Sequence, residues 1–234
     1  MLRRGLALAF GTMSNISVAA VDVGALKNIG WWHRALEGAT TSGRDLDSLV
    51  DRVVVDVQEH VPIALGFESP LFIPRPANAA DLNRQRMGER GRPWCAGAGT
   101  GALALGLQQS AYVFEAISRR VRPRVTFGLE ELTRGEADLL IWEAFVSGKA
   151  KNREALDPHI DDARVAVLEF GVRNAAGAVT SDILDTDVTN LAAANLLAAG
   201  LTTDLSMLNQ PCLVIRAPDL DPGGPGPTAP EEMS

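Results

Sequence analysis

The chain contains 234 residues, of which 46% are hydrophobic and 22% are charged, a balance typical of an ordinary globular protein. No run of 18 apolar residues occurs, so the sequence excludes a membrane-spanning helix. The net charge of −7 argues against a broad nucleic-acid-binding surface, although it is compatible with a local basic groove. Two cysteines, Cys95 and Cys212, match no metal-ligand spacing and indicate reduced thiols in a cytoplasmic protein.

The first elements of the chain predict a strand followed by a hairpin. Residues 1–14 form a short basic and apolar stretch, which we expect to be a disordered extension, or the product of an upstream start codon with Met13 as the true beginning. Residues 15–23 are β-branched and apolar and end at Gly24, which predicts a central strand buried on both faces. Residues 30–35 predict its hairpin partner, and residues 36–41 a third, weaker strand.

The rest of the chain predicts alternating helices and strands. Residues 45–61 carry apolar side chains close to the helical period. Residues 62–67 predict a strand that stops near Pro70, because proline lacks an N–H and restrains Ser69. We expect, in chain order, a polar loop over 74–93, a small-residue helix over 99–119, strands over 124–127 and 139–145, helices over 158–170 and 190–199, and a last strand over 212–216.

Two further features bear on how the chain is organised. Gly101 and Gly106, in the helix predicted over 99–119, indicate very close packing against the sheet. Residues 217–234 are rich in proline and glycine and contain four acidic residues without a basic one, which predicts a disordered acidic tail. We therefore expect a single domain over residues 15–216.

Asp22 and Glu68 each stand at the end of a strand predicted to be buried. An ionised carboxylate in such a position is costly unless a cation or hydrogen-bond donors compensate it. Open α/β sheets bind ligands at the ends of their strands, and two neighbouring parallel strands would bring both side chains to one edge. The alternative for Asp22 is a capping role in the hairpin turn.

A third acidic group stands at the start of the helix predicted over 158–170. His159 and Asp162 are three residues apart and therefore share one face of that helix. Two carboxylates with a histidine or a third carboxylate make a ligand set suited to Mg²⁺ or Mn²⁺. The alternative for His159 is an exposed histidine in the first helical turn.

Arginines are concentrated in the loop over 74–93, which follows the strand end at Glu68. Their planar forks match the geometry of phosphate, and Trp94 could stack on a base. The candidate substrate-binding residues are Lys27, Arg84, Arg86, Arg90, Arg92 and Trp94. The alternative is a solvated loop, with Trp94 as a core anchor for the helix that follows.

Three segments together resemble the RuvC-type resolvases of the RNase H-like superfamily. Residues 20–31, AVDVGALKNIGW, are similar to their opening strand and hairpin, and residues 63–72, IALGFESPLF, to their next strand with its acidic residue. Residues 158–168, PHIDDARVAVL, are similar to their last catalytic helix. Residues 141–145, IWEAF, are closer to several uncharacterised bacterial RNase H-like families.

This resemblance implies an α/β fold with a five-stranded mixed sheet, helices on both faces and a C-terminal extension from about residue 175. It also implies two divalent cations, Mg²⁺ or Mn²⁺, held by Asp22, Glu68 and Asp162 with His159 as the fourth member. Such a pair would clamp the attacking water and the leaving oxygen of a phosphodiester. Asp161 and Glu143 are alternative or outer ligands.

Three functions follow from these features. The resemblance favours a metal-dependent phosphodiester hydrolase, a nuclease acting on nucleic acid. The acidic body and the segment 175–216, which has no place in a minimal RuvC domain, favour a catalytically inert RNase H-like binding or regulatory protein. A phosphotransferase of the actin and sugar-kinase type normally needs two Asp-x-Gly units, and only one is visible. The helices over 99–119 and 190–199 could also form a homo-oligomer interface.

Overall fold

The computed structural model describes residues 15–89, 93–146, 150–152 and 154–218. The predictions for residues 1–14, for the tail from residue 219 onward, and for Arg90 and Arg92 lie outside these residues.

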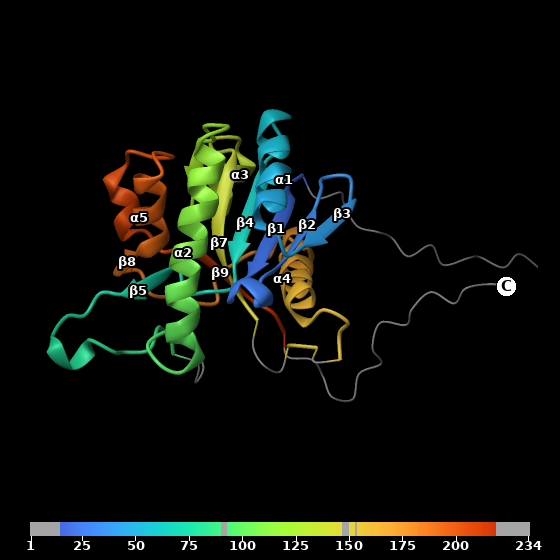
Figure 1. Ribbon diagram of the computed structural model, residues 1–234. Helices are drawn as coiled ribbons and strands as arrows, with labels where there is room; N and C mark the ends of the chain where they lie inside the picture. The colour runs from blue at the N-terminus through green and yellow to red at the C-terminus, as the bar shows by residue number, and fades with distance from the viewer. Residues whose placement is uncertain (1–14, 90–92, 147–149, 153, 219–234) are drawn as a thin grey trace, which may run out of the picture.

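A seven-stranded mixed sheet forms the centre of the fold (Figure 1). Its strands are β1 (Ser17–Asp22), β2 (Gly30–Arg34), β3 (Thr40–Gly43), β4 (Ile63–Phe67), β6 (Val125–Thr126), β7 (Leu139–Phe145) and β9 (Leu213–Arg216). The main path runs β3-β2-β1-β4-β7-β6, and β9 also pairs with β7. The β1–β2 and β2–β3 pairs are antiparallel and the other pairs are parallel.

The α/β class is confirmed, but the sheet has two strands more than the five that the RuvC resemblance implies, and both were predicted individually, over 124–127 and 212–216. Both additional strands lie along the outer side of β7. β6 pairs with its first residues, Leu139 and Leu140, and β9 pairs with its last four, from Trp142 to Phe145. The segment after residue 175 therefore extends the main sheet.

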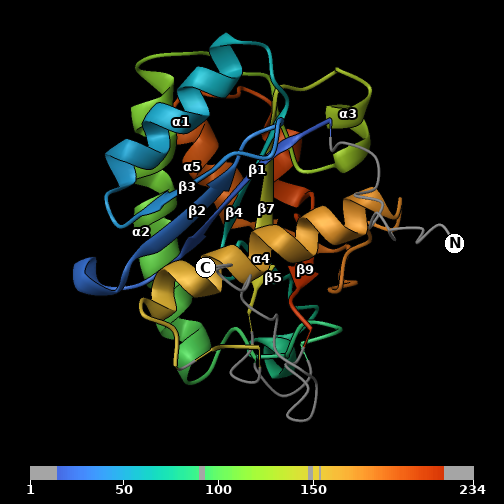
Figure 2. The same ribbon diagram turned by 90° about the vertical axis from the view of Figure 1, so that its right-hand side faces the viewer.

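Helices cover both faces of the sheet (Figures 1 and 2). The side chains of β1 alternate between two hydrophobic cores, with Ala19 and Val21 in one and Val18 and Ala20 in the other. The first core contains residues of α1 (Leu46–Gln58), α2 (Ala98–Ser118) and α5 (Leu191–Ala198). The second contains residues of α3 (Leu129–Thr133) and α4 (Pro158–Ala175). Figure 2 shows α4 lying across its face of the sheet.

The C-terminal segment packs against the rest of the chain. Its strand β8 (Val188–Asn190) pairs with β5 (Phe72–Pro74) in a second, two-stranded sheet. Helix α5 packs on α2, where the Asn195 amide donates hydrogen bonds to the Leu107 carbonyl at 2.8 Å and to Ser110 Oγ at 2.9 Å. The two small-residue helices that we considered for an oligomer interface are thus in contact within one chain.

Most predicted elements are present, with shifts where turns were misplaced. Strand β7 matches the predicted range residue for residue, whereas β3 begins at Thr40 because Gly38, with φ of +93°, forms a turn before it. The elements α3, β5 and β8 and the short 3₁₀ segments Leu26–Asn28 and Leu205–Asn209 were not predicted. A third 3₁₀ segment, Ala79–Asp81, lies in the 74–93 loop. None of the described helices could cross a membrane.

Gly101 and Gly106, for which the sequence predicted close packing, behave differently. A Cβ on Gly106 would lie 2.1 Å from Ser69 Oγ, so the predicted close packing is confirmed there. A Cβ on Gly101 would meet no described heavy atom within 4 Å, so the same prediction is wrong for Gly101. That part of α2 lines a cavity instead.

Candidate metal centre

The parallel pairing of β1 and β4 brings Asp22 and Glu68 together. Val21 of β1 is in register with Phe67 of β4, so the next residue of each strand lies at the same carboxyl edge. Alternation along a strand then directs both acidic side chains to the face that α4 covers, since Val21 and Phe67 belong to the opposite core. The sheet thereby places two carboxylates side by side.

Helix α4 supplies the third carboxylate because it approaches the sheet closely. Gly30 at the start of β2 permits this approach, since a Cβ there would lie 2.3 Å from the backbone carbonyl carbon of His159. Asp157 caps the helix by accepting hydrogen bonds from the backbone N–H groups of His159 and Ile160. Asp162, in the second turn, then points into the site and is buried.

The three carboxylates form a buried acidic cluster, as the sequence predicted. One oxygen each from Asp22, Glu68 and Asp162 lies within 4.8 Å of the others. The side chains of Asp22 and Asp162 are 7% and 5% exposed. Asp162 Oδ1 and Glu68 Oε2 are buried without a hydrogen-bond partner in the described part of the chain. Buried oxygens without a donor are what a bound cation would satisfy, so the cluster fits a metal ion.

A lysine that we did not predict lies in this cluster. Lys151 Nζ is 2.5 Å from Asp162 Oδ2, 2.8 Å from Glu68 Oε1 and 4.0 Å from Asp22 Oδ1. The His159 imidazole completes the group, with Nδ1 2.5 Å from Asp22 Oδ2. The cluster therefore combines three carboxylates with one ammonium and one imidazole.

Burial raises the pKa values of the acidic groups. It raises the pKa of Asp22 to about 6, while the hydrogen bond with Glu68 and the charge of Lys151 act in the opposite direction. The pKa of Glu68 lies well above its usual range because of burial and the charge of Asp22. Burial also raises the pKa of Asp162. Burial lowers the pKa of Lys151, but the charges of Glu68 and Asp22 outweigh it and raise the pKa above its usual value.

A cavity of about 730 Å³ adjoins the carboxylates. Asp22, Glu68 and Lys151 belong to its lining. Arg86 and Glu89 also line it. The remaining lining groups are mostly small or apolar, such as Trp94 and Leu105 near α2 and Phe145 in β7. The cavity places a substrate-sized space next to the carboxylates.

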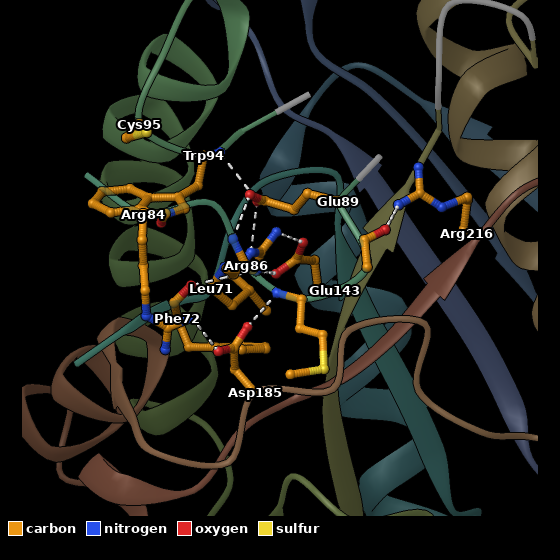
Figure 3. Close-up of polar contacts among 12 residues, drawn as sticks. Leu71, Phe72, Arg84, Arg86, Glu89, Trp94, Cys95, Glu143, Asp185 and Arg216 are labelled. Carbon is orange, nitrogen blue, oxygen red and sulfur yellow. Dashed lines mark hydrogen bonds and ion pairs between the residues drawn. The ribbon is translucent and has the colours of Figure 1, made fainter. Parts of the chain in front are cut away.

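Arg86 is buried rather than presented on a solvated loop. Its side chain is 1% exposed and donates two hydrogen bonds of 2.7 Å to the carboxylate of Glu143 and one of 2.7 Å to Glu89 (Figure 3). Glu89 also accepts from the backbone N–H groups of Arg86 and Trp94. Arg86 therefore belongs to an internal ion-pair network. Its guanidinium is bound to Glu89 and Glu143 and does not have the role of phosphate ligand that the sequence predicted.

The other predicted substrate-binding residues have varied positions. Arg84 is partly exposed and pairs with Asp185 at 2.7 Å, and Trp94 Nε1 donates to the Arg84 carbonyl at 3.0 Å while its ring borders the cavity (Figure 3). Lys27 is exposed in the turn after β1. Arg90 and Arg92 lie outside the described residues.

The two alternative ligands do not join the cluster. Glu143 is in register with Phe67 and therefore faces the opposite side of the sheet from Asp22, where Arg86 binds it. Asp161 pairs with Arg164 at 2.7 Å. Both suggestions were wrong because sequence position alone did not reveal the direction of either side chain.

No protein-family model matches this chain, and no match was found among the curated proteins or the solved structures. Function must therefore be inferred from the side chains that the fold brings together.

Proposed function

We propose that this protein is a Mg²⁺- or Mn²⁺-dependent phosphodiester hydrolase of the RNase H-like type that acts on nucleic acid. The observation that carries this proposal is the cluster of Asp22, Glu68 and Asp162, whose oxygens lie within 4.8 Å of one another. The strand path β3-β2-β1-β4-β7 supports the RNase H-like type, because it contains a five-stranded mixed sheet with helices on both faces.

The residues of the cluster have distinct tasks in this reaction. Asp22, Glu68 and Asp162 would hold the divalent cation, which when bound lowers the pKa of a water and neutralises charge on the phosphodiester. His159 contacts Asp22 and would fix the orientation of its carboxylate, as outer groups commonly do for metal ligands. Lys151 supplies a positive charge beside the same oxygens.

The cavity supports a nucleic-acid substrate. Its lining includes Trp94 as well as Asp22 and Glu68. An aromatic side chain in such a position offers a stacking surface for a nucleobase. A phosphodiester bound next to the carboxylates could therefore rest its base on Trp94.

The second candidate is a catalytically inert binding or regulatory protein of the same type. Two observations favour it. The ammonium of Lys151 already lies among the three carboxylates, where it offsets part of their charge. Arg86, one of the arginines expected to bind phosphate, is engaged inside the protein.

Cleavage assays with Mn²⁺ distinguish these candidates. Single-stranded, double-stranded and branched substrates would be incubated with the full chain and with Asp22→Asn and Asp162→Asn. We expect each variant to lose roughly a thousandfold in rate, because several kcal/mol of transition-state stabilisation depend on the cation. Asp161→Asn is the matched control, since Asp161 precedes Asp162 but pairs with Arg164, and it should retain activity. Undiminished cleavage by Asp22→Asn would rule out the hydrolase.

A further inference from the structure

The position of Lys151 bears on how many metal ions the carboxylate cluster holds. All three carboxylates have an oxygen within 4.0 Å of its Nζ. A cation shared by several carboxylates in this way takes the place that a bridging metal ion would otherwise take. The ammonium is tethered to the chain, so its local concentration does not depend on the solution.

The fold holds Lys151 in this place. The preceding residue, Ala150, is fully buried and belongs to the core between the sheet and α4. The backbone of Lys151 is therefore anchored beside α4, while its side chain is 31% exposed and reaches the carboxylates from the solvent side. A lysine on an unanchored segment would also lose backbone entropy on pairing with the acidic cluster.

The charges leave room for one divalent ion. In the ionised form that binds a metal, the three carboxylates together with the ammonium carry a net charge of −2, and one Mg²⁺ or Mn²⁺ neutralises this charge. Two such ions beside the ammonium would instead leave an excess of positive charge in a largely buried site, which is costly.

The carboxylate oxygens that Lys151 and His159 leave free also indicate one divalent ion. Lys151 engages Asp162 Oδ2 and Glu68 Oε1, and His159 engages Asp22 Oδ2. Within these three carboxylates, Asp162 Oδ1 and Glu68 Oε2 are buried without a hydrogen-bond partner in the described part of the chain. The other Asp22 oxygen, Oδ1, lies 4.0 Å from Lys151 Nζ, beyond hydrogen-bond distance. Each of the three residues therefore offers one oxygen that neither Lys151 nor His159 binds, a set for a single ion that water or substrate would complete.

We propose that Lys151 occupies the position of a second cation, so that this site binds one divalent ion per chain. The inference rests on the proposed function, because it concerns the same metal centre. It differs from the two-ion arrangement that the RuvC resemblance implies. The ammonium would act as a fixed positive charge beside the phosphodiester that the single ion also contacts.

Counting bound Mn²⁺ tests this directly and does not depend on activity. Electron paramagnetic resonance of the free aqueous ion, with isothermal titration calorimetry, gives the number bound per chain. We expect one ion for the unmodified protein, one for Lys151→Arg, which keeps the charge, and two for Lys151→Ala. Lys27→Ala, which removes an exposed lysine outside the cluster, is the matched control and should bind one. Circular dichroism would verify that each variant is folded.

The remaining outcomes separate the inference from the proposed function. Two ions bound to the unmodified protein would overturn the inference and leave a metal-dependent hydrolase intact. A single ion in Lys151→Ala, whatever its affinity, would also overturn it, because the ammonium would then not be occupying a cation position. If the unmodified protein binds no Mn²⁺, both the proposed function and the inference fail.

Discussion

Two buried acidic clusters lie on opposite faces of the same sheet, and they differ in how completely their charges are satisfied. On the face of α2 and α5, Glu89 and Glu143 share the guanidinium of Arg86, and each of their oxygens accepts a hydrogen bond. On the face of α4, Asp22, Glu68 and Asp162 share one ammonium, and two buried oxygens have no partner in the described chain.

This difference distinguishes a structural ion pair from a candidate binding site. In the first cluster a planar guanidinium pairs with Glu143 in bidentate geometry and donates a further hydrogen bond from Nε to Glu89, so nothing further is needed. In the second cluster one ammonium leaves Asp162 Oδ1 and Glu68 Oε2 without a donor. The same cavity borders Arg86 and Glu89 as well as Asp22 and Glu68, so the unpaired oxygens, and not access to the cavity, distinguish the second cluster. Burial of acidic groups alone therefore does not identify a site, whereas incomplete pairing beside a cavity does.

The largest expected effect is on stability and concerns the ion pairs of Arg86 with Glu89 and Glu143. Arg86→Met should lower the free energy of unfolding by about 3–5 kcal/mol, because it leaves two buried carboxylates without their counter-ion. Urea denaturation would measure the loss. Arg124→Ala removes an arginine that is 60% exposed and pairs with Asp138, and it should cost far less stability than Arg86→Met. Equal losses in the two variants would contradict the structural role assigned to Arg86.

The next effect concerns the imidazole that contacts Asp22. His159→Ala should weaken Mn²⁺ binding about ten- to hundredfold, because Asp22 loses the group that orients its carboxylate. Calorimetric titration would measure the affinity. His60→Asn is a suitable control, since His60 is exposed, has a φ of 58° that asparagine tolerates, and lies outside the cluster. Unchanged affinity in His159→Ala would remove the imidazole from the metal centre.

The smallest effect concerns the pH dependence of the metal-free protein. Because the pKa of Asp22 rises from 3.8 to about 6 on folding, its contribution to stability is fully present below 3.8 and is lost as the pH rises through 6. Asp22→Asn cannot ionise, so in a chelator it should have a Tm a few degrees above that of the unmodified protein at about pH 7.5.

The Tm difference between Asp22→Asn and the unmodified protein should shrink as the pH falls to about 4.5, where Asp22 holds its proton in the folded protein. Thermal unfolding followed by circular dichroism at both pH values would measure it. A Tm difference that does not change with pH would show that the ionisation of Asp22 is not what destabilises the metal-free protein.

The elements that carry the carboxylates could be predicted from the sequence. The apolar run that ends at Asp22, the proline that stops the next strand after Glu68, and the capped start of the helix with Asp162 are local signals. These signals identify strand ends and helix starts, which is where the cluster lies. The small elements β5 and β8 gave no such signal, because three-residue strands depend on their partner rather than on their own pattern.

The contacts between distant residues could not be predicted in the same way. Lys151 has no motif around it, and only the anchoring of Ala150 beside α4 brings it to the carboxylates. Arg86 belongs to a polar loop in the sequence, yet its partner Glu143 is 57 residues away in a buried strand. The alternation along β7 could have separated Glu143 from Asp22, but only once the register of β7 with β4 was known.

The pairing of β9 with the outer side of β7 matters during synthesis, because β9 is made after the rest of the main sheet. A nascent chain that ends after α4 already contains Asp22, Glu68, Lys151 and Asp162, but β7 from Trp142 to Phe145 still lacks its outer neighbour. An open strand edge of this kind is a template for pairing with other chains. A chain truncated before Leu213 should therefore aggregate more readily, although it still contains every member of the carboxylate cluster.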